Sequence, residues 1–188
     1  MVPDAELNDS YLPVYAEMSA GRYERAAEFL EELLAEMEST GPRDDLGAQD
    51  VRHKLAVSYQ NIGRYEEAVA LAERAVTGFR ELLGTEAMAT LAVQTTLAFA
   101  YTLVGREPEA LALQEETLAG YRDLLGAEYG DTLECQYNLG IILGRAGRDD
   151  EARALFEEML PICQRVLGPG DDLTQSVAGI VAENRESE

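Results

Sequence analysis

Hydrophobic residues recur along most of this chain at spacings of three and four, the spacing of helices that bury one face. The clearest run covers residues 24–39, where apolar side chains alternate with a face of glutamates. We expect helices over residues 12–20, 24–39, 50–62, 65–83, 90–104, 108–125, 132–146, 149–167 and 174–184. We expect residues 1–10 to be irregular.

The flanking residues predict where these helices begin and end. Asp9 or Ser10, Thr90, and Asp131 or Thr132 are of the types that cap helix N-termini. Pro13 and Pro108 are expected in first helical turns, where a missing N–H costs least. The inward-facing set is expected to include residues that close the apolar stripes, among them Phe29, Leu82, Leu124 and Val166.

One short element recurs four times in the chain. It begins with Gly-Arg and ends with Ala, and its copies start at residues 21, 63, 105 and 147, each 42 residues after the last. A fixed period in the range of about 20–50 residues is typical of stacked repeats. The glycine suits a sharp turn after one helix, and the alanine allows close packing of the next helix. The arginine is placed near helix C-terminal carbonyls, where a cation is favoured.

The period predicts one all-α domain over residues 1–188. Its four helical hairpins cover about residues 8–41, 48–84, 90–126 and 132–168, and a capping helix covers about 174–184. Terminal units of a stack must solvate their outer face, and the last residues turn polar accordingly. Cys135 and Cys163 are expected to be small core residues, since two cysteines make no disulfide framework.

The hairpin pattern resembles that of the tetratricopeptide repeat family. The matching residues in the second hairpin are Leu55, Ala56, Tyr59, Gly63, Tyr65 and Ala68, and those in the third hairpin are Leu97, Ala98, Tyr101, Gly105 and Ala110. In the fourth they are Leu139, Gly140, Gly147, Ala152 and Phe156. The 42-residue spacing resembles the kinesin light chain type of repeat, which is common in bacterial proteins. The first hairpin departs from the pattern at Pro13 and Val14. The resemblance implies a right-handed superhelical solenoid.

The resemblance also implies a concave groove that binds peptides or protein segments and is lined by the first helix of each hairpin. Position by position, it gives Tyr11, Leu12, Tyr15, His53, Lys54, Val57, Gln60, Asn61, Thr95, Thr96, Phe99, Thr102, Leu103, Tyr137, Asn138, Ile141 and Arg145. These positions are less acidic than the rest of the chain. Asn138 resembles the groove asparagine that holds a bound peptide's backbone. Tyr15 and Phe99 are the aromatic residues we expect to be exposed, whereas Tyr11 and Tyr137 are anchors or packing residues.

Charge narrows the class of partner. The formal net charge is −21, which argues against nucleic acid and against anionic membrane surfaces as partners. The acidic residues are spread along the chain, which favours a role in solubility over recognition of a basic partner. The N-terminal sequence lacks the features of a signal peptide, so we expect a cytoplasmic protein.

The sequence contains no arrangement typical of catalysis. His53 is the only histidine, and no nucleophile motif, phosphate-binding loop or metal-ligand spacing accompanies it. We therefore expect no cofactor, no metal and no enzymatic activity. The leading hypothesis is a protein–protein interaction module that acts as an adaptor, scaffold or regulator. The alternative is a unit for homo-oligomerisation, and a small-molecule sensor or enzyme comes third.

Overall fold

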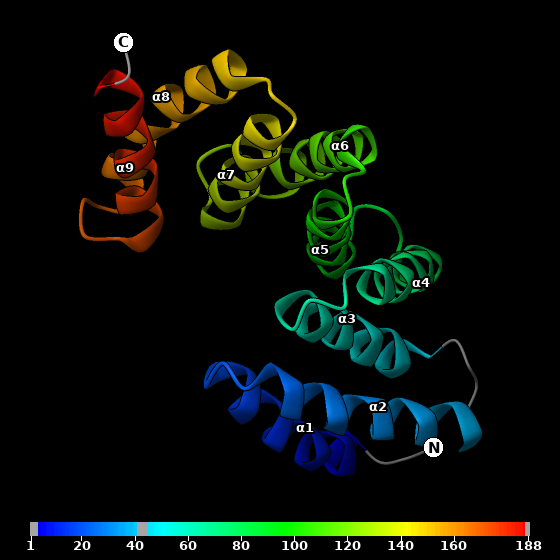
Figure 1. Ribbon diagram of the computed structural model, residues 1–188. Helices are drawn as coiled ribbons and strands as arrows, with labels where there is room; N and C mark the ends of the chain where they lie inside the picture. The colour runs from blue at the N-terminus through cyan, green and yellow to red at the C-terminus, as the bar shows by residue number, and fades with distance from the viewer. Residues whose placement is uncertain (1–3, 41–44, 187–188) are drawn as a thin grey trace. The chain divides into compact units, whose positions relative to one another are not determined.

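Every regular element that the structure describes is an α-helix (Figure 1). The computed structural model describes residues 4–40 and 45–186, with side chains from 12–39 and 45–183. The helices are α1 (Asp4–Ser19), α2 (Tyr23–Thr40), α3 (Leu46–Asn61), α4 (Tyr65–Leu83), α5 (Met88–Leu103), α6 (Glu107–Leu125), α7 (Gly130–Arg145), α8 (Asp149–Val166) and α9 (Asp172–Glu186). The predicted all-α fold of sequential hairpins is confirmed.

The helices form two compact units, residues 1–104 and 105–188. The first unit holds α1 to α5 and the second holds α6 to α9. The single continuous domain and its superhelical handedness stay predictions.

The predicted glycine turns are confirmed in both units. Gly63 and Gly147 have φ values of 82° and 73°, a conformation that side chains with a Cβ rarely adopt. The next residue closes each turn: the Arg64 N–H donates to the Tyr59 carbonyl, and the Arg148 N–H to the Leu143 carbonyl, both at 2.9 Å. These bonds satisfy carbonyls that the ending helix leaves without a partner.

The core of the first unit is a cluster of apolar side chains from α1 to α4. Val14, Leu30, Val51 and Leu55 are each no more than 3% exposed, and Ala68 is fully buried. Burying one large aliphatic side chain contributes roughly 1.5–3 kcal/mol, so this cluster holds the two hairpins together. The buried alanine confirms the role predicted for the end of the repeated element.

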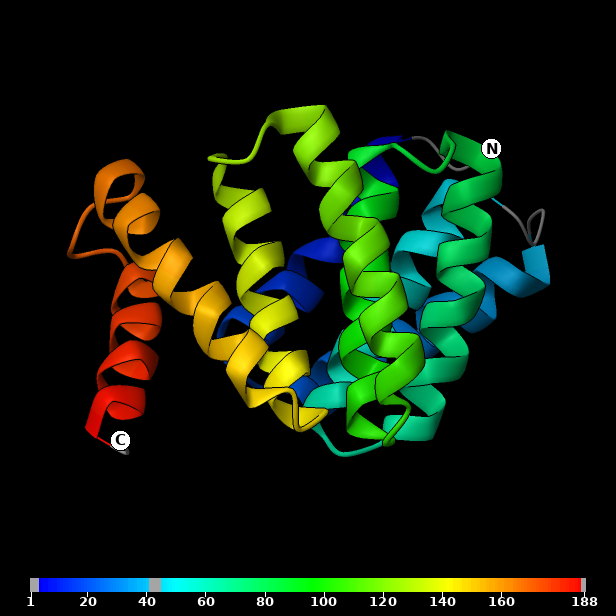
Figure 2. The same ribbon diagram turned by 90° about the horizontal axis from the view of Figure 1, so that it is seen from above.

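In the second unit, α8 lies between α7 and α9 (Figure 2). Leu133, Met159 and Cys163 are fully buried, and Val177 of α9 is as well. Cys135 is also buried, and both cysteines are free thiols, so their predicted place in the core is confirmed. Burial raises the pKa of the Cys163 thiol, which keeps it protonated and unreactive.

Two predicted helix starts were wrong. α1 begins at Asp4, so Asp9 and Ser10 lie inside it rather than capping it, and Pro13 is in its interior. α3 begins at Leu46 rather than at residue 50, because the Asp45 carboxylate caps it by accepting a hydrogen bond from the Ala48 N–H at 2.7 Å. For α3, local propensity predicted a later start because it did not include the Asp45 cap.

The threonines that repeat every 42 residues do not cap helices as predicted. α5 and α7 begin two residues before Thr90 and Thr132, and both threonines are fully buried. The Thr90 hydroxyl donates to the Gly84 carbonyl at 2.8 Å, and that of Thr132 donates to the Tyr121 carbonyl. Each hydroxyl therefore ties the start of a helix to the end of the preceding one.

Four residues predicted to face inward are largely exposed. Phe29 is 45% exposed, Leu82 45%, Leu124 48% and Val166 40%. The last three occupy one repeat position at the end of α4, α6 and α8. The last turn of each second helix therefore reaches past the core, which the apolar spacing alone could not reveal.

Candidate functional site

The candidate groove residues lie on the first helices of the hairpins, as predicted. Those of the first unit come from α1, α3 and α5, and those of the second unit come from α7. The Tyr11 side chain falls outside the described residues. The two sets belong to different units.

His53 and Gln60 of α3 reach Thr96 of α5. His53 Nε2 lies 2.9 Å from the Thr96 hydroxyl oxygen, and Gln60 Nε2 donates to the Thr96 carbonyl at 2.8 Å. The two first helices are therefore neighbours, and their polar side chains hold them in register. These three residues shape the surface more than they offer free groups to a ligand.

The surroundings of His53 favour a neutral imidazole. Burial lowers its pKa to about 4; the Lys54 charge adds to this and the Asp50 charge opposes it. The Thr96 hydroxyl also lies 3.4 Å from the Ala92 carbonyl one turn back, so it has a second hydrogen-bond partner within its own helix.

Tyr15 and Lys54 form a polar and aromatic pair between α1 and α3. The Lys54 ammonium lies 5.4 Å from the centre of the Tyr15 ring, within the range of a cation–π contact. Lys54 also pairs with Asp50 one turn earlier on α3. Tyr15 remains 52% exposed, which confirms its predicted accessibility.

Phe99 on α5 is the second accessible aromatic residue among the groove candidates of the first unit, at 40% exposed. Nearby, Val57 and Thr95 are half-buried and Asn61 is exposed. Thr102 was predicted to line the groove, and this was wrong. It is 5% exposed and its hydroxyl donates to the Ala98 carbonyl one turn back.

The α7 candidates of the second unit differ in how far solvent reaches them. Tyr137 is half-buried, and its ring lies 5.7 Å from the Phe156 ring at an angle of 58°. This residue packs within the α7–α8 hairpin, as its alternative interpretation held. Asn138 and Ile141 are half-buried and Arg145 is exposed.

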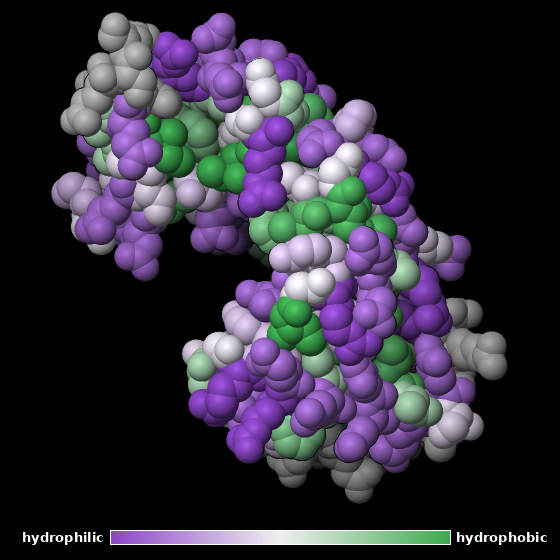
Figure 3. Space-filling model, viewed as in Figure 1, coloured by the Kyte–Doolittle hydropathy of each residue, from purple (hydrophilic) through white to green (hydrophobic). Residues whose placement is uncertain are grey.

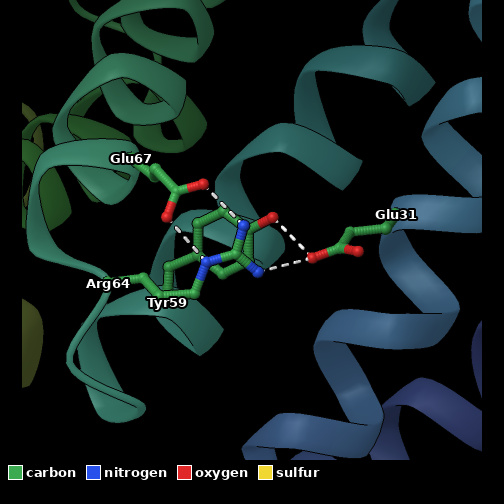
Figure 4. Close-up of polar contacts among 4 residues, drawn as sticks. All are labelled: Glu31, Tyr59, Arg64 and Glu67. Carbon is green, nitrogen blue, oxygen red and sulfur yellow. Dashed lines mark hydrogen bonds and ion pairs between the residues drawn. The ribbon is translucent and has the colours of Figure 1, made fainter.

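One polar cluster escaped the sequence interpretation. Glu31 of α2 accepts hydrogen bonds from the Tyr59 hydroxyl at 2.6 Å and from Arg64 at 2.7 Å (Figure 4). Arg64 lies over the Tyr59 ring at 3.7 Å and also binds Glu67. Arg64 of the repeated element therefore joins its own hairpin to the preceding one. The signal was present, since both Glu31 and Tyr59 recur 42 residues later.

The electrostatics of this cluster follow from its contacts. The Tyr59 hydrogen bond, and then Arg64, hold the pKa of Glu31 below its usual value. Burial and the Glu31 carboxylate raise the pKa of Tyr59 to about 12. In the next repeat the Tyr101 hydroxyl donates to Glu73 at 2.9 Å, so the same contact recurs.

The described part of the chain shows neither a metal-binding cluster nor a membrane-spanning helix. No group of three histidine, cysteine or acidic side chains is placed there to hold a metal ion. Each helix searched is too short or too polar to span a bilayer. On the face drawn in Figure 3, apolar side chains form several separate patches among hydrophilic ones.

Comparison with known proteins places the chain among repeat proteins. Two crystal structures of a Podosopora anserina protein described as a kinesin light chain with nearly identical TPR-like repeats match at a TM-score of 0.82. In the first, a variant, identity is 26%, with 97% of this chain and 86% of that chain covered; in the second, identity is 27%, with 97% and 87% covered. BtubC (BKLC) from P. vanneervenii matches at a TM-score of 0.76 and 20% identity, covering 97% of this chain and 76% of that one.

A search among curated protein sequences found no match. The family model described as tetratricopeptide repeat matches residues 47–123 and 89–165, which together span more than half of the chain. Proteins built from this repeat generally mediate protein–protein interactions, and the fold is typically non-enzymatic. The chain belongs to the tetratricopeptide repeat family.

Proposed function

We propose that the chain is an interaction module that binds an extended peptide or protein segment on the surface of its first helices, as an adaptor, scaffold or regulator. The observation that carries the proposal is the pair of exposed aromatic side chains, Tyr15 and Phe99, on α1 and α5. Tyrosine and phenylalanine are enriched in the buried cores of protein–protein interfaces, where a partner covers such rings.

Polar groups on the first helices of each unit suit a peptide backbone. Asn61, Asn138 and Thr95 carry amides or hydroxyls at or near the surface. A peptide in extended form needs such donors and acceptors to replace its hydrogen bonds to water. The acidic residues elsewhere favour solubility, and a basic partner remains the subsidiary proposal.

Substitution of one candidate residue from each unit, Phe99 and Asn138, tests this proposal. Phe99→Ala removes an exposed ring, so we expect weaker partner binding, by roughly tenfold if the ring is an anchor, with little change in melting temperature. Asn138→Ala is expected to have a smaller effect in the same direction. Binding is measured by calorimetry with a partner recovered from native lysate on the immobilised protein.

Phe29→Ala is the matched control, because Phe29 is as exposed as Phe99 but lies on a second helix, α2. It should leave binding unchanged. Equal loss in both phenylalanine variants, or none in either, would contradict a site on the first helices. Light scattering of the free protein at several concentrations checks that the affinity measured is not that of a second copy of the chain.

A further inference from the structure

One position of the 42-residue repeat holds tyrosine in the first unit and leucine in the second. Tyr59 and Tyr101 occupy it in the first unit, and each donates its hydroxyl to a glutamate of the preceding second helix. In the second unit the position is Leu143, which is buried. Glu115, which corresponds to Glu31 and Glu73, therefore receives no phenol.

Two further positions of the repeat, near the turn of each hairpin, also carry smaller side chains in the second unit. Ile62 and Val104 correspond to Ala146, while Tyr23 and Tyr65 correspond to Glu107. The backbone is not the cause, because Ile62 and Ala146 end their helices in similar conformations, with φ, ψ of −101°, 7° and −77°, 1°. The larger side chains that the first unit has at these positions are thus absent from the second unit.

A concavity of about 670 Å³ borders two of these positions, Glu107 and Ala146. Its lining includes Glu107, Leu111 and Glu115 of α6 together with Arg145, Ala146 and Arg148 of the α7–α8 turn. The volume falls within the roughly 300–1,000 Å³ typical of ligand pockets. The pocket thus offers apolar surface beside carboxylate and guanidinium groups.

The second unit keeps the charged groups that surround the tyrosine ring in the first unit. The Glu151 hydrogen bond raises the pKa of Arg148, and the attraction of Glu115 adds to this. Arg148 binds Glu151 through two bonds of 2.6 Å, much as Arg64 binds Glu67. The guanidinium and carboxylate that flank a phenol ring in the first unit are therefore both present here, without the ring.

We propose that this pocket receives a tyrosine side chain from a partner protein. The ring would lie against Leu111, Ala146 and the Arg148 guanidinium, and the hydroxyl would donate to Glu115. The chain's own Tyr59 shows that a glutamate and an arginine at these repeat positions accept a phenol. Only Arg145 is shared with the proposed peptide surface, so the inference does not rest on the proposed function.

The test uses N-acetyl-L-tyrosinamide as the probe and the full chain labelled for NMR. We expect saturable shifts of the Leu111 and Ala146 signals at millimolar probe, because one side chain gains little affinity alone. N-acetyl-L-phenylalaninamide, which lacks the hydroxyl, should bind several-fold more weakly. Absence of saturable shifts, or equal binding of the two probes, would overturn the proposal.

Two variants locate the binding. Ala146→Ile restores the residue type of Ile62 and should abolish the shifts, whereas Ala154→Ile, at an exposed site elsewhere on α8, should leave them intact. Glu115→Gln should weaken tyrosinamide toward the affinity of phenylalaninamide. Unchanged binding in folded Ala146→Ile, or in Glu115→Gln, overturns the assignment.

Leu143→Tyr supplies the phenol from within the chain. It should block the probe and raise the melting temperature, as the new hydroxyl reaches Glu115. Phe99→Ala should leave tyrosinamide binding untouched, so failure of the peptide surface and failure of this pocket are distinguished.

Discussion

At the scale of single residues, the imidazole of His53 is the side chain whose ordinary pKa lies nearest neutral pH. It is the only histidine, and burial between α3 and α5 lowers its pKa from 6.5 to about 4. The unfolded chain therefore binds this proton more tightly than the folded one. Lowering the pH through 6.5 favours unfolding, and the loss is complete once the pH falls below the folded pKa.

This linkage gives a pH-dependent prediction for His53→Gln, which keeps a polar group near Thr96 but cannot titrate. Relative to the variant, the wild-type chain should lose up to about 2 kcal/mol of unfolding free energy between pH 7 and pH 5. Urea unfolding of both proteins at several pH values measures this. The comparison is needed because protonation also relieves the repulsion of a chain with net charge −21.

The carboxylates act in a different pH range. Hydrogen bonds hold the pKa values of Glu31 and Glu38 below 4.5, so their contribution is present above that value and disappears at lower pH. If the free energies of unfolding of the wild-type chain and of His53→Gln change in parallel from pH 7 to pH 5, His53 is not protected from protonation as inferred.

At the scale of helices, α7 offers two glycines one turn apart with opposite surroundings. A Cβ on Gly140 would lie 2.4 Å from the Phe156 ring, whereas a Cβ on Gly144 would have no neighbour within 4 Å. Gly140 therefore lets α7 and α8 approach closely. Gly144 lies in the same helix and has no such role.

Gly140→Ala should lower the free energy of unfolding by about 1–3 kcal/mol, because the methyl group overpacks the hairpin. Gly144→Ala should leave it unchanged or raise it by up to about 1 kcal/mol, since alanine has the higher helix propensity. Thermal and urea unfolding measure both variants. Similar effects at the two positions would contradict the close approach of α7 and α8.

The sequence predicted elements better than it predicted individual contacts. The 42-residue period placed the turn within each hairpin, because Gly63 and its counterparts meet a conformational demand that few other residues satisfy. Thr90 was misassigned, because the sequence does not distinguish a threonine that caps a helix from one whose hydroxyl binds a carbonyl of the preceding helix. Thr102 was misplaced for a related reason: the resemblance fixes a repeat position but not its burial.

At the scale of the whole molecule, each unit is held together by contacts between successive helices, so a terminal helix has a protective role. α9 packs on α8 and buries Val177 and Val181 almost completely. Without α9, the surface of α8 that it covers would be open to water. Exposed apolar surface of this kind favours self-association, even in an acidic chain.

A chain ending at Asp171 should therefore melt at lower temperature and associate as its concentration rises, whereas a chain ending at Glu183 keeps both valines and should behave as the parent. Val177→Ala provides a milder change, with an expected cost of about 1–3 kcal/mol from lost burial and the remaining cavity. Thermal unfolding and light scattering over a range of concentrations report the two effects separately. If the chain without α9 melts and scatters like the parent, its buried valines contribute nothing to the stability of the second unit, and the burial of Val177 cannot be the reason that the helix is there.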